Sequence, residues 1–579
     1  MGLQHALAML GGIITVPLVL TYSTPFVPKG APGAEDTLNT PDTAQYLVAS
    51  ALICCGILSI IQVIQIKIPF TPYHLGTGLI SVVGTSFVFL PIGETALQTM
   101  IDDGKTGREA YGALLGTCMV ATWIEVFLSF IPPAQLKKMF PPLVTGVTII
   151  LIGAGLCGTG LKYWGGGVWC QEHFEERTWA SSIQAAPGCS GNGEVKLPYG
   201  SPEYVALGSA CLCMMVLIEC IGSPFMKNCN IIISLLFGYF VASLCEFDGE
   251  RATYTDCTSV PNKFGPCDAD GNGRVEYVTS AKIDLAPWIT FIWAETFPLG
   301  FYAPALIPLV IGMVVSTIES VGDIQVSAEV SRLREDFEDQ EKYELDVNER
   351  IQGGLLADGI NSFIAAFMTQ MPNTTYSQNN GVIALTNCGS KAAGIACGLW
   401  LIFFGIIAKF AALFTSVPDC VLGGVTTFLF ANVVVSGIRI LGTDAAFMAG
   451  DRRARTILCI SLGIGLGVTM KPGWIEAPFA LSHKYGIMPK ENSCEMWAQS
   501  CTTDILNVTT CTPTSVCEEW DGGRGWRDAL ILILKTPYSI GPLLALLLNT
   551  MLPTTEVPSA KGGKGEAEEH PDGIMEQSL

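Results

Sequence analysis

The sequence predicts an all-α polytopic membrane protein, and three observations support this fold class. Hydrophobic residues make up 49% of the 579 residues and charged residues only 15%, with a mean hydropathy of +0.43. Soluble domains carry about 25% charged residues. The five histidines show no metal-ligand spacing, and no soluble domain fits between the apolar runs, so an enzyme is not expected. Runs long enough to span a bilayer recur along the chain, for example Tyr46 to Ile66, Tyr111 to Ile131, Tyr204 to Gly222 and Arg527 to Leu552.

We expect about fourteen spans, some of them broken by Gly or Pro, from a window of ~19 residues. The first, Gly2 to Thr21, lacks a basic n-region and a cleavage motif, so it is interpreted as a mature helix. Basic residues fall in short loops on one side, which the positive-inside rule makes cytoplasmic, together with both termini. These residues are Lys67, Lys137, Lys138, Lys227, Arg439, Arg452, Arg453 and Arg455.

The long loops then lie outside the cell and hold cysteines in even numbers, which indicates disulfides in an oxidising space. Their pairing is left open. The pattern Asn507-Val-Thr509 is an acceptor for N-glycosylation, which also places its loop outside. The loop cysteines are Cys170, Cys189, Cys257, Cys267, Cys494, Cys501, Cys511 and Cys517.

One outer segment, DADGNGRVEYVT, follows the first six positions of an EF-hand calcium loop, with Asp268, Asp270 and Asn272 as candidate ligands. Thr279 stands where the loop requires a bidentate Glu. A plain turn is therefore the favoured interpretation, and a weak calcium site is the alternative.

Two pairs of segments suggest an internal duplication. PFTPYHLGTGLI at Pro69 matches PNTTYSQNNGVI at Pro372 with an offset of 303 residues (372 − 69). PPLVTG at Pro141 matches PDCVLG at Pro418 with an offset of 277 residues (418 − 141). An odd number of spans per copy would insert the copies in opposite orientations, so that broken helices meet near the bilayer midplane. The first pair predicts such broken helices.

Several amide side chains follow the second of these breaks, in the stretch QNNGVIALTN from Gln378 to Asn387. An amide offers both donors and acceptors. A cluster of amides at the start of a half-helix fits a ligand with a mixed hydrogen-bonding edge, and an ordinary polar turn is the alternative.

Carboxylates inside the apolar runs are the second candidate site. Glu319 and Asp323 lie four residues apart, on one face of a helix, and Asp358 follows in the next span with Asn361 beside it. A charge in a membrane is costly and usually marks a substrate or ion site. For Asp323 a structural ion pair is an equal alternative, and His5 is more simply a structural residue. Glu125, Glu219 and Lys409 are interpreted as structural pairs or snorkelling side chains.

These motifs resemble the nucleobase-ascorbate transporter family. QNNGVIALT looks like the family signature, and Gln4-His5, Ser86-Phe87, the run from Glu319 to Asp323 and the run from Asp358 to Asn361 are similar in order and spacing. The resemblance covers nearly the whole membrane region. It is strongest to the fungal uric acid/xanthine permeases, which carry GLQHALAML and QNNGVIALT in much this form.

The resemblance implies fourteen spans as 7+7 inverted repeats, with short antiparallel strands at Tyr73 to Gly78 and Tyr376 to Gly381, in the broken third and tenth spans. It also implies a plasma-membrane homodimer whose core moves against a gate in an elevator-type motion. The core would comprise residues 1–139 (spans 1 to 4) and 284–416 (spans 8 to 11). The gate would comprise 140–283 and 417–552, followed by a cytoplasmic tail at 553–579.

Residue roles are implied in the same way. Glu319 and Gln378 would bind the purine edge and Phe87 would stack on its face, with Ser86, Ser377 and Asn379 completing the binding site. The proton is the implied coupling ion, and no other cofactor is expected. A supporting or proton-coupling network would consist of Asp323, Asp358, His5, Gln4, Asn380, Thr386 and Asn387.

The sequence departs from the family at Asn387, where the signature usually ends in Arg, Lys or Gly. The chain also begins a few residues before Gln4, where fungal members carry a cytosolic tail. Gln378 favours purines over the uracil-type and ascorbate-type members. The expected function is proton-coupled import of uric acid and xanthine. The alternatives are a permease for another nucleobase or ascorbate, or a purine sensor that does not transport.

Overall fold

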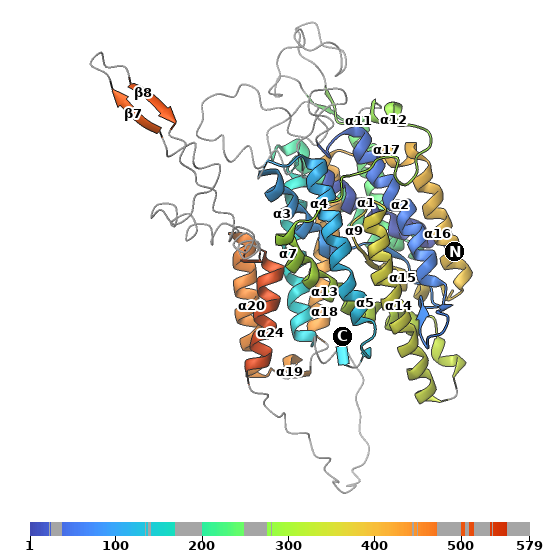
Figure 1. Ribbon diagram of the computed structural model, residues 1–579. Helices are drawn as coiled ribbons and strands as arrows, with labels where there is room; N and C mark the ends of the chain where they lie inside the picture. The colour runs from blue at the N-terminus through green and yellow to red at the C-terminus, as the bar shows by residue number, and fades with distance from the viewer. Residues whose placement is uncertain are drawn as a thin grey trace, which may run out of the picture.

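The computed structural model is mostly helical (Figure 1). In the part of the chain that it describes, eight helical stretches are long and apolar enough to cross a membrane. This confirms a helical, multi-pass membrane-type fold. The described residues are 1–22, 24, 37–102, 104–133, 135–136, 141–167, 200–247, 275–278, 281–337, 339–442, 445–448, 450–471, 499–503, 509–513, 533–534 and 536–552.

The long apolar helices are α1 (Gly2–Tyr22), α2 (Pro41–Val63), α4 (Gly107–Ala121) with its continuation α5 (Trp123–Leu128), α7 (Pro142–Trp164), α9 (Pro202–Ile221), α13 (Ala303–Val330), α18 (Asp419–Leu441) and α20 (Arg452–Met470). The other helices include η1 (Phe87–Phe89), α3 (Leu90–Asp102), α10 (Pro224–Asn228), α11 (Asn230–Leu244), α12 (Ala281–Leu285), η3 (Leu333–Asp336), α14 (Gln340–Phe367), α15 (Gln378–Thr386), α16 (Lys391–Ile406), α17 (Ala408–Thr415), α19 (Ala445–Met448) and α24 (Pro537–Met551).

Local sequence explains where many of these helices begin. Pro stands in the first turn of α2, α7, α9 and α24, where its fixed φ suits the helix and its missing N–H is not needed. At α4, Thr106 and Glu109 form a capping box in which each side chain accepts from the backbone N–H of the other.

The helices pack in two groups. In the first, α1, α2 and α16 pack together, and α13 and α14 pack on α4 and α5. In the second, α7 and α18 share the most extensive contact, joined by α9, α11, α20 and α24. Figure 1 shows α20 and α24 side by side at one edge of the molecule. The two groups meet through contacts such as α1 with α11 and α13 with α7.

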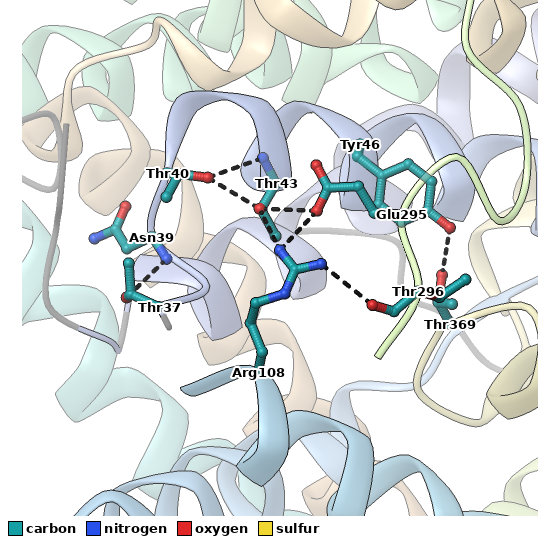
Figure 2. A network of polar contacts seen from close by, with 9 residues as sticks. All are labelled: Thr37, Asn39, Thr40, Thr43, Tyr46, Arg108, Glu295, Thr296 and Thr369. Atoms are coloured by element: carbon teal, nitrogen blue, oxygen red, sulfur yellow. Dashed lines mark hydrogen bonds and ion pairs between the residues drawn. The ribbon is translucent and has the colours of Figure 1, made fainter. Parts of the chain in front are cut away.

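A polar network fastens one end of the first group (Figure 2). The Arg108 guanidinium forms a 3.0 Å ion pair with Glu295 and donates to the carbonyl of Thr296. Thr43 of α2 donates to the same Glu295 carboxylate at 2.9 Å. The Tyr46 hydroxyl lies 2.9 Å from that of Thr369. The segment before α13 is thereby tied to α2 and α4.

The central strand pair is formed by other residues than the two expected segments. The observed central pair is β3 (Val83–Thr85) with β6 (Asn373–Thr375), antiparallel and buried, with Gly84 opposite Thr374. Residues Tyr73 to Gly78 were expected to form the first strand. They instead contribute β2 (His74–Leu75) to a separate hairpin with β1 (Ile66–Lys67). Residues Tyr376 to Gly381 follow β6 and enter α15.

The offset of 303 residues is therefore wrong as a structural correspondence. Pro69 lies in the turn of the β1–β2 hairpin, next to the fully exposed Phe70, whereas Pro372 directly precedes the buried β6. The second offset holds for whole elements, because α7 and α18 begin and end 277 residues apart (419 − 142 and 441 − 164).

Several predictions fall outside the described residues. They are the calcium candidates Asp268, Asp270 and Asn272, the glycosylation acceptor Asn507, Lys137, Lys138 and the tail 553–579. Of the loop cysteines, only Cys501 and Cys511 lie in described elements, β7 (Gln499–Thr503) and β8 (Thr509–Pro513). The register of these two strands places Cys501 opposite Cys511. The disulfides stay predictions.

Candidate functional site

The candidate site is built around the β3–β6 strand pair. The backbone pairing continues beyond the strands, because Ser86 donates its N–H to Pro372 and Tyr376 donates its N–H to Val82, each at 3.0 Å. Helical turns begin directly after each strand, at Phe87 and at Gln378. Two interrupted helices therefore start at opposite ends of one short ladder, where irregular backbone at membrane depth is paired within the protein.

Tyr376 fixes the geometry of this crossing. Its hydroxyl donates to the Thr85 carbonyl at 2.9 Å. Its ring lies against two glycines, since a Cβ at Gly84 would lie 2.5 Å from the ring Cζ and one at Gly12 3.0 Å from Cε2. Larger residues at Gly84 or Gly12 would displace the ring, so α1 and both strands are held in contact through it.

Helix α13 presents the predicted carboxylates to β6. The Thr375 hydroxyl donates to Asp323 at 3.1 Å and lies 3.3 Å from the Ser320 hydroxyl. Ser320 also contacts the Thr374 hydroxyl at 3.4 Å and donates to Asp358 of α14. Asp323 and Asp358 are thus joined through the strand.

Glu319 differs from these two carboxylates. Its side chain is half-buried, like that of Asp323, but no hydrogen bond or ion pair is recorded for it within the described residues. Asp323 and Asp358 each have one oxygen that accepts from a hydroxyl group, whereas both oxygens of Glu319 are left to accept from a ligand.

The two asparagines of the signature are engaged by the protein. The buried Asn379 accepts from His5 Nδ1 at 2.8 Å and donates to the Ile80 carbonyl at 2.8 Å. Asn380 accepts from the Ser327 hydroxyl at 2.5 Å and donates to the Asp323 carbonyl at 3.2 Å. Asn379 therefore links α15 to α1 and the segment before β3, and Asn380 links α15 to α13.

Gln378 and Ser377 are exposed at the start of α15, and the described structure records no side-chain hydrogen bond for either. Gln4 is half-buried on α1. At the other end of α15, the Thr386 hydroxyl donates to the Val382 carbonyl. Asn387 ends the helix in the left-handed conformation, with φ of 49°, and accepts from Arg332 at 3.2 Å. An arginine from another segment therefore contacts the position where the family signature usually carries a basic residue or Gly.

Phe87 and Ser86 lie at the start of the other interrupted helix. Ser86 is fully buried, and its hydroxyl accepts from the Val88 N–H at 3.2 Å. The half-buried Phe87 ring meets Phe430 of α18 edge to face, with 5.8 Å between ring centroids. Phe430 brings the second helix group to the edge of the site.

Comparison with known proteins decides the family. The sequence model of the Permease family matches residues 1–179 and 180–473. The chain belongs to this family. This confirms the family predicted from the sequence, and also the prediction that the protein is a transporter rather than an enzyme.

Named relatives of this permease include a uric acid-xanthine permease from Emericella nidulans. It is 36% identical over 96% of this chain and 80% of the relative. A purine permease of the same organism is 38% identical over 83% of this chain and 75% of the relative. The xanthine permease XanQ of Escherichia coli is 30% identical over 77% of this chain and 81% of the relative. The transmembrane domain of the cyanobacterial bicarbonate transporter BicA aligns over 79% of this chain and 94% of its own, with 12% identity and a TM-score of 0.46.

Sequence reasoning missed several residues that build the permease site. Ser320 lies directly after Glu319, and its hydroxyl could have been read as a partner for a carboxylate. Tyr376, two residues before Gln378, entered the predictions only as a mark of the repeat and as the start of an expected strand. Thr375, three residues before Gln378, carried no prediction. Phe430 could not be identified from the sequence, because the residues of an apolar helix do not indicate which of its rings packs against Phe87.

Glu219 and Lys409 have the structural partners expected of them. Glu219 accepts from Asn230 at 3.0 Å. Lys409 donates to the carbonyls of Ile283 and Asp284 at 2.5 and 3.1 Å, and its ammonium lies 5.4 Å from the Trp288 ring centre.

Proposed function

We propose that this permease is a proton-coupled symporter that imports oxidised purines, uric acid and xanthine, across the plasma membrane. The printed names of the relatives, which include uric acid-xanthine, purine and xanthine permeases, support purines as the substrate class. The chemistry of the site supports the same class.

The observation that carries the proposal is the free hydrogen-bonding capacity of Glu319 and Gln378. Both lie on elements that contact β6 or follow it, and neither side chain has a recorded partner in the described structure. A carboxylate accepts from ring N–H groups, and a carboxamide offers one donor and one acceptor in a plane. Together they match the edge of an oxidised purine.

The flat face of the purine requires a different partner. Phe87 begins the opposite interrupted helix and offers an aromatic face for stacking. The backbone near Ser86 and Ser377, at the two helix starts, would supply further hydrogen-bonding groups. A bound base without the matching edge would cover these polar groups and leave them unpaired, at about 1–3 kcal/mol each, which gives the site its selectivity.

We assign Asn379 to positioning instead of direct binding, because its amide is already bonded to His5 and Ile80. His5 and Asn380 act in the same way, by holding α15 against α1 and α13. Asp323, Asp358 and the other members of the supporting network would carry or stabilise the coupled proton.

We further propose fourteen spans in two inverted repeats. The spans would be α1, α2, β3 with α3, α4 with α5, α7, α9, α11, α13, α14, β6 with α15, α16, α18, α20 and α24. The offset shared by α7 and α18 supports the duplication, since these would be spans 5 and 12. The two packing groups support the division into core and gate. An elevator-type motion of the core in a homodimer would carry the purine.

Uptake of labelled xanthine in cells without their own purine permeases tests this function. We expect saturable uptake that falls when a protonophore collapses the proton gradient. Unlabelled uric acid should compete, while uracil and ascorbate should not. Purine binding to the purified protein without uptake would support a sensor, and competition by ascorbate or uracil would overturn the assigned substrate.

A further inference from the structure

Glu125 is a buried carboxylate that the proposed purine site does not use. It lies on α5 with no exposed surface. One oxygen, Oε1, accepts from the Thr317 hydroxyl of α13 at 3.4 Å. The other oxygen, Oε2, is buried and has no hydrogen-bond partner within the described residues.

Asp358 of α14 has the same pattern. It is fully buried, its Oδ2 accepts from Ser320, and its Oδ1 is buried without a partner in the part of the chain that is described. Thr317 and Ser320 lie one turn apart on α13, so one helix serves both carboxylates. Each acid thus has one bonded oxygen and one orphaned oxygen.

A glycine brings the two acids together. A Cβ at Gly359, next to Asp358, would lie 2.9 Å from the backbone N of Val126 and 3.3 Å from the carbonyl carbon of Glu125. The turn of α14 that carries Asp358 therefore touches the backbone of α5 at Glu125.

Within the described residues, no cation is paired with either acid. Among the described residues no ion pair with Lys or Arg is recorded for Glu125 or Asp358. On the helices packed against α5, Arg108 of α4 is paired with Glu295, and Lys342 and Arg350 of α14 are paired with Asp339 and Asp346. Helix α13 contributes the acidic Glu319 and Asp323. Two ionised carboxylates without a cation in a low-dielectric interior carry both a desolvation cost of several kcal/mol each and mutual repulsion. One acid of such a pair binds a proton, as in carboxyl dyads.

We propose that Glu125 and Asp358 share one buried proton, held between Glu125 Oε2 and Asp358 Oδ1. The proton is covalently bonded to one carboxyl oxygen and accepted by the other, so the pair keeps a single negative charge. This arrangement satisfies both orphaned oxygens with one hydrogen bond. Glu125 is then a second member of the proton-binding machinery, alongside Asp358.

Hydroxyl groups connect this pair to the purine side. Ser320 donates to Asp358, the Thr375 and Ser320 hydroxyls are in contact, and Thr375 donates to Asp323. A proton can pass along this row if each hydroxyl accepts one proton and releases its own to the next oxygen. The total number of protons is unchanged. This coupling role rests on the proposed function. The shared proton itself is independent of it.

Infrared difference spectroscopy on the purified full chain in lipid nanodiscs tests the shared proton. We expect a protonated carboxyl C=O band that shifts on exchange of H2O for D2O. The band should be lost in both Glu125→Gln and Asp358→Asn, because either change removes one member of the pair. The matched control Glu219→Gln should keep it, since Glu219 is exposed and bonded to Asn230.

Transport provides the second readout. With one proton coupled, a one-unit pH gradient supports about tenfold xanthine accumulation in proteoliposomes. We expect Glu125→Gln to lose this accumulation while xanthine exchange across the membrane persists. If Glu125→Gln does not fold, Glu125→Asp, which keeps the acid, should retain a shifted carboxyl band.

A wild-type spectrum without the band, or a band unchanged in Glu125→Gln, would overturn the shared proton. Retained accumulation in a folded Glu125→Gln would remove its coupling role. If the band behaves as expected but the wild type transports no purine, the shared proton stands and the proposed function fails.

Discussion

The Tyr376 hydroxyl donates to the Thr85 carbonyl at 2.9 Å, and this bond ties the two interrupted helices to each other at the point where their strands pair. Because Gly84 and Gly12 leave room for the ring, the contact also fixes α1. The positions of Phe87 and Gln378 relative to each other depend on this contact.

Enlarging Gly84 should therefore destabilise the fold. A Cβ at Gly84 would lie 2.5 Å from the Tyr376 ring, so Gly84→Ala must displace the ring or the strand. We expect a loss of about 1–3 kcal/mol in the free energy of unfolding, as for overpacked cores. Thermal melting in detergent measures it. Gly155, beside which a Cβ meets nothing within 4 Å, gives the control Gly155→Ala. Equal melting temperatures for the two variants would contradict the packing described here.

Replacing Glu319 should reduce purine uptake without reducing the amount of protein at the cell surface. Glu319→Gln keeps the shape but converts an acceptor-only group into one that also donates toward the purine N–H. We expect at least a tenfold loss of xanthine kcat/KM, which corresponds to ~1.4 kcal/mol. Surface expression should be unchanged. Glu329→Gln changes an exposed acid on the same helix and should transport normally. Wild-type kinetics in Glu319→Gln would argue strongly against the site.

Gln378→Glu should change which bases compete. The carboxylate loses the amide donor and adds a negative charge, so a purine carbonyl oxygen beside it would be repelled. We expect weaker inhibition by uric acid and xanthine and stronger inhibition by bases that present more donors. A panel of unlabelled purines and pyrimidines against a common labelled substrate measures this. An unchanged order of inhibitors would place Gln378 away from the substrate edge.

Asn379→Ala should act differently from Gln378→Glu. It leaves His5 Nδ1 and the Ile80 carbonyl without their partner, at a cost of about 1–3 kcal/mol for each buried group. We expect a lower melting temperature and slower uptake with an unchanged order of competing bases. A change of substrate preference with unchanged stability would instead make Asn379 a direct ligand.

The sequence predicted the membrane-type fold and the family because both depend on features that are local in the chain. Apolar runs and the QNNGVIALT signature are of this kind. The strand positions could not be obtained in the same way. Pro69 and Pro372 have similar neighbours, yet one lies in an exposed hairpin and the other precedes a buried strand.

Contacts between residues that lie far apart in the sequence could not be predicted from it either. From its place in an apolar run, the sequence favours structural pairing or snorkelling for Glu125 and does not identify a partner. Its partners, Thr317 and the turn at Asp358, come from later helices. Phe430 meets Phe87 for the same reason, through packing between helix groups that no single segment encodes.

The most direct test of the central claim is accumulation of labelled xanthine in proteoliposomes that contain the purified permease and an imposed inward proton gradient. The account predicts transient accumulation above equilibrium in the wild type, and its loss in both Glu319→Gln and a sample with the gradient collapsed. Equal xanthine entry with and without the gradient, or full accumulation by Glu319→Gln, would contradict it.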